Sequence, residues 1–154
     1  MVLDIKKIEY SKELSGGILM TSQHTAEDRE YVCESLIAHN VEHTSGLLGK
    51  PGIDINLYLK DGPAVIGAIL CMTYNMCLYI DVLWLEKSYR GKGYGSALIE
   101  QAEKIAKEHG CIFSHTNTSS FQSPEFYKAC GYEVFGELGD FPDGIVTYFL
   151  KKTL

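Results

Sequence analysis

The chain has 154 residues, a length that suits a single domain, and its 20 Asp and Glu residues against 14 Lys and Arg residues give a net charge of −6. Hydrophobic residues make up 45% of the sequence and charged residues 22%, values typical of globular proteins, which excludes a disordered chain or a fibrous repeat. Because Lys and Arg are scattered rather than clustered, the charge argues against a nucleic-acid partner and suits a neutral or cationic one.

The sequence shows no sign of a membrane span or a signal peptide. Residues 62–80 form the longest nearly uncharged stretch, but Pro63 and Gly67 interrupt it and its composition is that of β-strands. The first ten residues carry charges where a signal peptide needs an apolar centre. Five cysteines without a C-x-x-C pair indicate reduced thiols. We therefore predict a cytoplasmic protein whose residues 1–154 form one domain.

The first third of the chain predicts short strands and one helix. Residues 2–10 are compatible with a strand, and residues 18–21, an apolar run after two glycines, fit a strand better. Thr25 and Asp28 have the spacing of a capping box, which opens a helix that we expect to run to about His43.

The middle of the chain predicts a meander of three antiparallel strands. Apolar residues alternate with other residues over residues 53–59, and Asp61-Gly62-Pro63 then forms a turn. Residues 64–73 make the returning strand. Residues 77–85, rich in β-branched and aromatic side chains, form the third.

The last part of the chain alternates helices with strands. Apolar residues spaced by three and four predict a helix from Tyr94 to Gly110. The strand expected next, residues 111–115, can pair in parallel with the strand before that helix through a right-handed crossover. The remaining elements are a helix over residues 124–131 and strands over residues 132–136 and 145–150. Together these elements predict a mixed α/β sheet.

The most informative segment lies between the third strand and the long helix and reads Arg90-Gly91-Lys92-Gly93-Tyr94-Gly95-Ser96. Its three closely spaced glycines let the backbone approach a ligand, and the start of a helix adds positive dipole. Arg90 and Lys92 add positive charge, so the segment predicts a cradle for a diphosphate. It lacks the Lys-Ser/Thr pair of a nucleoside-triphosphate P-loop, and Ser96 stands where the dinucleotide fingerprint needs a glycine.

This segment resembles the R/Q-x-x-G-x-G/A signature of the GNAT N-acetyltransferase superfamily. The resemblance covers about residues 78–133, because the strand ending Leu83-Trp84-Leu85, the helix and the segment 126–132, Phe-Tyr-Lys-Ala-Cys-Gly-Tyr, also match. One departure is Glu86-Lys87, where family members often have a Pro. The resemblance implies a GNAT-like fold, a central and mostly antiparallel twisted sheet of about six to seven strands with a splayed parallel pair, flanked by helices.

The resemblance also implies acetyl-CoA as co-substrate and assigns its contacts. The diphosphate would lie beside Arg90 and accept hydrogen bonds from the backbone N–H groups of Gly91, Lys92, Gly93, Tyr94, Gly95 and Ser96. The pantetheine arm would lie in the gap between the splayed strands, bonded to backbone groups of Leu83 and Leu85. Asn117 matches a position that often touches the arm or the substrate.

The implied reaction is the direct attack of an amine on the acetyl group in a ternary complex, without a metal. Tyr127 matches the tyrosine that often protonates the departing thiolate in the family. The phenol of a tyrosine has a pKa of about 10 and a thiol has a pKa of about 8.5, so there is little driving force for full transfer of the proton from the phenol to the thiolate. A hydrogen bond from the phenol to the sulfur is therefore the alternative role. A second alternative is a tyrosine that only packs on the sheet.

A carboxylate is placed to help this reaction. An amine with a pKa of about 10.4 is neutral in only about one molecule in 2,500 at pH 7, so its deprotonation matters. Period-two alternation puts Tyr79, Asp81, Leu83 and Leu85 on one strand face, which would place Asp81 near the acetyl group. Asp81 would then take the amine proton or hold a cationic substrate, and the alternative is a purely structural carboxylate.

Two other functions stay open at this point. His39, Glu42 and His43 reproduce the H-x-x-E-H pattern of a zinc peptidase, which also needs a third ligand and a much larger framework. A non-catalytic module that keeps the acyl-CoA cradle for sensing or binding is the other alternative. The predicted function is an acetyl-CoA-dependent N-acetyltransferase for a cationic small amine or a peptide amine, and the resemblance implies that a homodimer is a common assembly.

Overall fold

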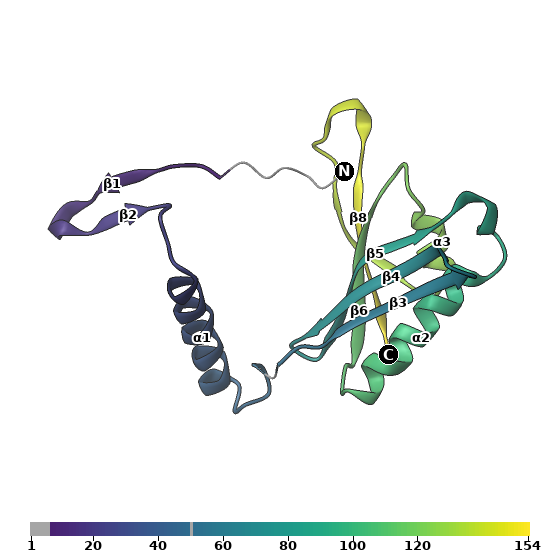
Figure 1. Cartoon of the computed structure of the whole chain (residues 1–154), viewed down its shortest axis with the longest axis horizontal. Coiled ribbons are helices and arrows are strands. Elements are labelled where there is room, and N and C mark those ends of the chain that lie inside the picture. The colour runs from purple at the N-terminus through teal and green to yellow at the C-terminus, as the bar shows by residue number, and fades with distance from the viewer. Residues whose placement is uncertain (1–6, 50) are drawn as a thin grey trace. The chain divides into compact units, whose positions relative to one another are not determined.

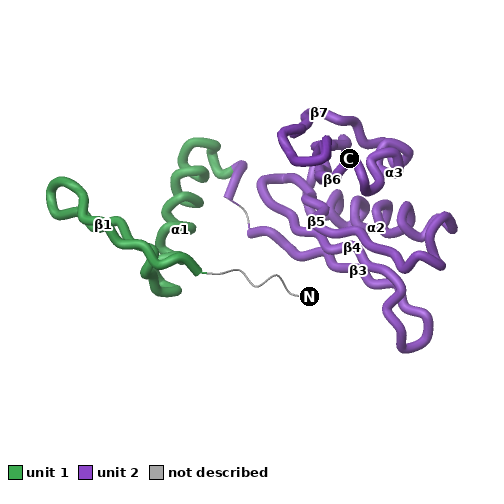
Figure 2. Tube along the Cα trace, turned by 90° about the horizontal axis from the view of Figure 1, so that it is seen from above, with its two compact units in different colours: residues 1–46 green, residues 47–154 purple. Residues whose placement is uncertain are grey.

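The computed structural model describes residues 7–49 and 51–154. The chain divides into two compact units, residues 1–46 and residues 47–154 (Figure 2). The single domain expected over residues 1–154 stays a prediction. In the described part of the chain, no helix is long and apolar enough to cross a membrane.

The first unit consists of a short hairpin and a helix (Figure 1). Its elements are β1 (Ser11–Glu13), the 3-10 turn η1 (Ser15–Gly17), β2 (Leu19–Thr21) and α1 (Ala26–His43). Strands β1 and β2 pair antiparallel. The strand expected over residues 18–21 is confirmed as β2. Of the strand expected over residues 2–10, residues 2–6 lie outside the described residues and residues 7–10 form no strand.

The start of α1 is capped as the sequence predicts. The backbone N–H of Thr25 donates to Asp28 Oδ2 over 2.7 Å, and the backbone N–H of Asp28 donates to Thr25 Oγ1 over 3.1 Å. These two bonds satisfy N–H groups that have no carbonyl partner within the helix. The helix ends at His43, where the sequence places its end.

The second unit, within residues 51–154, contains a six-stranded sheet in the order β3-β4-β5-β6-β8-β7. Its strands are β3 (Asp54–Asp61), β4 (Ala64–Tyr74), β5 (Cys77–Leu85), β6 (Phe113–Ser119), β7 (Glu133–Leu138) and β8 (Thr147–Thr153). Between them lie α2 (Tyr94–Glu108), α3 (Pro124–Ala129) and the 3-10 turns η2 (Lys87–Tyr89) and η3 (Pro142–Gly144). The pairing of β5 with β6 is parallel and the other described pairings are antiparallel, which confirms the predicted mixed sheet and meander.

Helix α2 covers one face of the sheet because its apolar side chains recur every three or four residues. Leu98, Ile99 and Ala102 are buried against a sheet core that includes Ile69 on β4 and Leu78 on β5. Burying side chains of this size provides most of the stability of such a layer. The core therefore fixes α2, and with it the N-terminus of the helix, against β4 and β5.

Strands β5 and β6 share only a short parallel ladder. The ladder runs from Cys77 opposite Phe113 to Ile80 opposite Thr116, although β5 continues to Leu85 and β6 to Ser119. The buried hydroxyl of Thr116 donates to the carbonyl oxygen of Ile80 over 2.9 Å and closes the last rung. Beyond this rung the two strands part, which confirms the splayed parallel pair that the resemblance implied.

A β-bulge at Asp81 changes which side chains share a face of β5. Opposite β4, Cys71 pairs with Ile80 and Leu70 pairs with Val82, so Asp81 is an extra residue. The alternation restarts after it. Leu83 pairs with the buried Ile69 on the α2 side, whereas Tyr79 precedes the bulge and lies on the opposite face. The expectation that Tyr79 and Leu83 share a face is therefore wrong.

The boundaries of two other strands also differ from the sequence prediction. The strand expected over residues 111–115 begins two residues later and extends to Ser119, so Asn117 lies inside β6. The strand expected over residues 145–150 is Thr147–Thr153. Both strands continue through polar residues, which the hydrophobic pattern does not mark as strand. These residues are Thr116 and Thr118 in β6 and Lys151 and Lys152 in β8.

Replacing a side chain by alanine should lower the free energy of unfolding more on one face of β4 than on the other. Ile69 is fully buried under α2, so Ile69→Ala should lower the free energy of unfolding by about 2–4 kcal/mol through lost burial and the cavity left behind. Met72 lies on the opposite face and is 44% exposed, so Met72→Ala is the matched control and should cost less than about 1 kcal/mol. Urea denaturation followed by circular dichroism measures both. Equal losses in the two variants would contradict the assignment of the core to the α2 face.

Candidate active site

A pocket of the second unit opens where β5 and β6 part. Its volume is about 830 Å³. Its walls come from the end of β5, the loop before α2, the start of α2, the end of β6 and the segment that leads into α3. The lining residues are Asp81, Val82, Leu83, Trp84, Leu85, Arg90, Gly91, Gly93, Gly95, Ser96, Asn117, Thr118, Phe121, Gln122, Ser123, Phe126 and Tyr127.

The glycine-rich loop forms one end of this pocket. Gly91 and Gly93 adopt positive φ angles of 72° and 84°, which side chains other than glycine rarely tolerate. Gly93 is the N-cap of α2, and its carbonyl accepts the first helical hydrogen bond, from the N–H of Ala97 over 3.0 Å. The N–H groups of the first helical turn therefore have no carbonyl partner within the helix. Together with the helix dipole they make this end of the pocket electrostatically favourable for an anion.

Gly95 is required for a different reason. A Cβ atom built on it would lie 3.1 Å from the ring of Phe126 on α3, closer than such contacts normally are. Because Gly95 lacks this atom, the first turn of α2 can pack directly against α3. The third glycine of the segment thus serves packing, whereas Gly91 and Gly93 serve the turn.

The two basic residues of the segment point to different places. Arg90 lines the pocket and donates from Nε to the carbonyl oxygen of Leu85 over 2.9 Å, which ties the loop to the end of β5. The Nζ atom of Lys92 lies 5.3 Å from the ring centroid of Tyr89, and the hydroxyl of Tyr89 donates to Asp61 over 2.6 Å. Lys92 and Tyr94 are not among the residues that line the pocket. Among the described residues that line the pocket, the basic side chain is therefore that of Arg90.

The backbone of β5 turns polar groups toward the gap. The backbone N–H of Glu86 donates to the carbonyl oxygen of Ile66 on β4 over 2.9 Å. In this regular part of the strand, the backbone N–H and C=O groups of Glu86 and of every second residue before it therefore face β4. Leu83 and Leu85 lie between them and direct their N–H and C=O groups away from β4, to the side where β6 has separated. Their side chains contact the core of the α2 face.

Tyr127 closes the pocket from the side of α3. Its side chain is only 7% exposed, and its ring packs edge-on against the rings of Phe126 and Tyr132, with centroid distances of 5.4 and 5.7 Å. Burial raises the pKa of Tyr127, and a hydrogen bond with the Thr116 side chain partly opposes this effect. The phenol therefore keeps its proton at neutral pH and can act as a donor.

Asp81 and Asn117 lie on the two separated strands. Asp81 is exposed at the bulge and lines the pocket. Its negative charge adds to burial in raising the pKa of the Cys71 thiol to about 12. Asn117 donates from Nδ2 to the hydroxyl oxygen of Tyr79 over 3.1 Å, so Tyr79 orients this amide even though it does not line the pocket itself.

Tyr79 is held in turn by His115 and Tyr74. The rings of Tyr79 and His115 stack with centroids 5.0 Å apart, and the hydroxyl of Tyr74 lies 2.6 Å from Nε2 of His115. Burial lowers the pKa of His115, which favours its neutral form. This chain of contacts links the exposed face of the sheet to Asn117.

Sequence reasoning missed part of the pocket wall. Val82 and Trp84 line the pocket together with Asp81, Leu83 and Leu85, although alternation along β5 would assign them to the other face. Phe121, Gln122 and Ser123 belong to the segment between β6 and α3 and match no motif that we recognised. The Pro that follows them is a usable signal, since it marks the start of a helix and hence a chain reversal.

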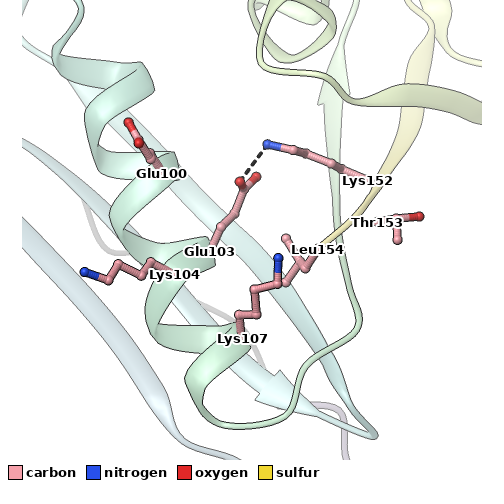
Figure 3. A pocket seen from close by; sticks show the side chains of 7 residues that line it. All are labelled: Glu100, Glu103, Lys104, Lys107, Lys152, Thr153 and Leu154. Atoms are coloured by element: carbon pink, nitrogen blue, oxygen red, sulfur yellow. Dashed lines mark hydrogen bonds and ion pairs between the residues drawn. The ribbon is translucent and has the colours of Figure 1, made fainter.

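A second hollow, of about 430 Å³, lies between α2 and the end of β8 (Figure 3). Glu103 and Lys152 point toward each other there and form an ion pair of 2.6 Å. The buried hydroxyl of Tyr132 lies 2.9 Å from the Glu103 carboxylate and 2.8 Å from the hydroxyl of Ser114. Because Tyr132 packs against Tyr127, this network supports the wall behind Tyr127.

The histidine pair of the H-x-x-E-H pattern lies on α1. The rings of His39 and His43 have centroids 4.0 Å apart, and Nδ1 of His43 lies 2.8 Å from the backbone oxygen of His39. Among residues 7–49 and 51–154, no group of three or more His, Cys, Asp or Glu side chains is arranged to hold a metal ion. A zinc peptidase centre needs three protein ligands, so the described residues do not supply one around this pair.

Comparison with known proteins gives consistent results. The model of the acetyltransferase (GNAT) family matches residues 18–132. Blasticidin-S acetyltransferase of Streptomyces morookaense is 44% identical over 78 residues, which are 50% of this chain and only 57% of that protein. The chain thus matches little more than half the length of this relative.

Solved structures share the fold. The crystal structure of an acetyltransferase from Bacillus cereus is 34% identical, with a TM-score of 0.75 over 86% of this chain and 95% of that chain. A Bacillus anthracis protein assigned as a streptothricin acetyltransferase, solved in complex with acetyl coenzyme A, is 24% identical. Its TM-score is 0.60 over 68% of this chain and 64% of that chain, and at this identity the likeness concerns the fold alone.

The thiols of this chain should differ strongly in reactivity. Cys71 is 3% exposed and its pKa is raised to about 12, so at pH 8 only about one thiol in 10,000 is ionised. Cys33 is exposed. Brief alkylation of the native protein at pH 8, followed by peptide mass spectrometry, should modify Cys33 and spare Cys71 until denaturant is added. Labelling of both at equal rates would contradict the buried setting of Cys71.

Proposed function

Because the chain belongs to the GNAT acetyltransferase family, we propose that it transfers the acetyl group of acetyl-CoA to a primary amine by direct attack in a ternary complex. The amine nitrogen forms a bond to the thioester carbon, the carbon–sulfur bond breaks, and the products are an amide and free coenzyme A. One proton leaves the amine and one is taken up by the thiolate. No metal or covalent enzyme intermediate takes part in this scheme.

The observation that carries this proposal is the position of the anion site beside the gap between β5 and β6. The loop around Gly91 and Gly93 and the N-terminus of α2 line one end of the pocket, and Leu83 and Leu85 turn backbone groups to the gap next to it. A diphosphate at the helix and an extended arm along β5 fit these two features. Arg90 adds a charge-assisted contact for the diphosphate.

We propose that Tyr127 assists the departing thiolate and that Asp81 assists the attacking amine. Tyr127 is buried, protonated and in the pocket, so its hydroxyl can hydrogen-bond or protonate the sulfur as it leaves. Asp81 is the acidic side chain among the described residues that line the pocket. Its carboxylate can take the amine proton directly or through water, or hold the ammonium group before it loses the proton.

For the acceptor we propose a cationic small amine. The net charge of −6 and the carboxylate of Asp81 favour a positively charged substrate over an acid. The similarity to blasticidin-S acetyltransferase supports blasticidin S as a candidate acceptor, and a peptide amine is the alternative. The homodimer stays a prediction, which size-exclusion chromatography with light scattering would test.

Titration and turnover together test the function. Isothermal titration calorimetry with CoA and acetyl-CoA should detect binding, and a thiol-release assay over blasticidin S, streptothricin, polyamines and N-terminal peptides should find at least one amine that is acetylated. Tight binding without thiol release for any amine would favour a non-catalytic acyl-CoA module. Absence of binding to either form of the coenzyme would overturn the proposal.

Replacing Asp81 should change the pH dependence of the reaction. Asp81→Asn removes the proton acceptor, so kcat/KM at pH 7 should fall about 100-fold. The loss should shrink as the pH rises toward 10, because more of the substrate amine is then already neutral. Asp54→Asn, at an exposed position that begins β3, is the control and should leave the profile unchanged. An unchanged rate and pH profile in Asp81→Asn would remove Asp81 from the mechanism.

Replacing Tyr127 should separate chemistry from coenzyme binding. Tyr127→Phe keeps the ring contacts with Phe126 and Tyr132 but removes the hydroxyl, so kcat should fall about tenfold or more while the Kd for acetyl-CoA stays within about twofold. Steady-state kinetics and calorimetry measure the two quantities. If turnover is undiminished, Tyr127 has only a packing role.

A further inference from the structure

The segment between β6 and α3 places Gln122 in the wall of the pocket. Its Oε1 atom accepts a hydrogen bond of 2.8 Å from the backbone N–H of Ser119 and one of 3.1 Å from the hydroxyl of Thr118. The backbone N–H of Gln122 also donates to the carbonyl of Ser119 over 2.8 Å, which closes a tight turn. The side chain is thus folded back onto the end of β6.

These contacts fix the direction of the Gln122 amide. A backbone N–H can only donate, so the amide atom that it meets must be the oxygen and not the nitrogen. The hydroxyl of Thr118 is bonded to the same oxygen. The Nε2 group, with two N–H donors, therefore points away from Thr118 and Ser119, and among the described residues it donates to no protein acceptor.

We infer that Gln122 donates a hydrogen bond from Nε2 to a carbonyl oxygen of the acetylated pantetheine arm. This inference rests on the proposed use of the pocket for acetyl-CoA. The arm carries amide carbonyls and one thioester carbonyl, all of which accept hydrogen bonds. On the opposite wall, backbone groups of Leu83 and Leu85 on β5 face the gap. A donor on the β6 side would therefore bind the other side of the arm.

The protein orients this donor before the ligand arrives. An exposed glutamine normally loses side-chain freedom on binding, and this loss of entropy weakens the binding. Gln122 has already lost much of that freedom to the two bonds on Oε1. Its N–H groups are therefore available to a ligand at a lower entropic cost than those of a free side chain.

Gln122→Glu tests the donor without disturbing the turn. A glutamate keeps an oxygen at the Oε1 position for Thr118 and Ser119 but replaces the NH₂ group with a second oxygen, so the variant loses only the donor and gains a negative charge. We expect the Kd for acetyl-CoA to rise about tenfold. The melting temperature should stay within about 2 °C of the wild type, because both bonds to the turn remain.

Ser120→Asp is the control for the added charge. Ser120 is exposed and is not among the residues that line the pocket, and an aspartate there can still accept the hydrogen bond from the backbone N–H of Val146. The variant therefore adds the same charge two residues away and leaves the Gln122 amide intact. Its effect on the Kd should stay below about threefold and should vanish in high salt, whereas the loss in Gln122→Glu should persist.

Calorimetry with CoA and acetyl-CoA distinguishes the carbonyl that Gln122 contacts. An equal loss for both ligands identifies a pantetheine amide, and a loss for acetyl-CoA alone, with a lower kcat, identifies the thioester. If Gln122→Glu binds both ligands as well as Ser120→Asp does, Gln122 is only a structural residue and the inference is overturned. If the wild type itself binds neither ligand, the proposed function fails instead.

Discussion

The separation of two parallel strands is the constraint on which the site depends. Strands β5 and β6 stay paired only to the rung of Ile80 and Thr116, where the Thr116 hydroxyl bonds to the Ile80 carbonyl. The bulge at Asp81 follows at once on β5. The backbone groups of Leu83 and the N–H of Leu85, which a sheet would normally pair, thus face a gap, whereas the carbonyl of Leu85 is bonded to Arg90. Such backbone groups are costly to leave without partners. An extended ligand with amide groups satisfies them, so the gap favours a peptide-like arm.

The hydrophobic core decides where the anion site lies. Leu98, Ile99 and Ala102 anchor α2 on β4 and β5, and this anchoring fixes the first turn of the helix at the end of the gap. Nearby, Arg90 is bonded to the carbonyl of Leu85, which joins the loop to the strand. The helix dipole is worth only about 0.3–1 kcal/mol at a surface, so the proposed diphosphate would also need the glycine backbone and Arg90 to hold it.

Sequence reasoning predicts the parts of this site that rest on local chemistry. The glycines, the amphipathic α2 and the crossover to a parallel strand follow from residue types and spacing, and the sheet confirms them. The bulge cannot be predicted, because nothing in the sequence from Cys77 to Leu85 marks an extra residue. For this reason the sequence does not show that Tyr79 lies on the opposite face of the sheet from Leu83. Lys92 shows the same limit, since its side chain turns to Tyr89, a partner that only the folded chain supplies.

The charges in the pocket give the proposed reaction a direction. Among the described lining residues, the charged side chains are Arg90 and Asp81, and they lie at opposite ends of the strand segment that faces the gap. The four steps from Asp81 to Leu85 alone span about 13 Å of extended chain. A coenzyme with its diphosphate at Arg90 therefore extends its acyl end toward Asp81, where a cationic amine is attracted. Reversing the coenzyme would bring its phosphates to the carboxylate, so the same two charges favour the productive orientation of both substrates.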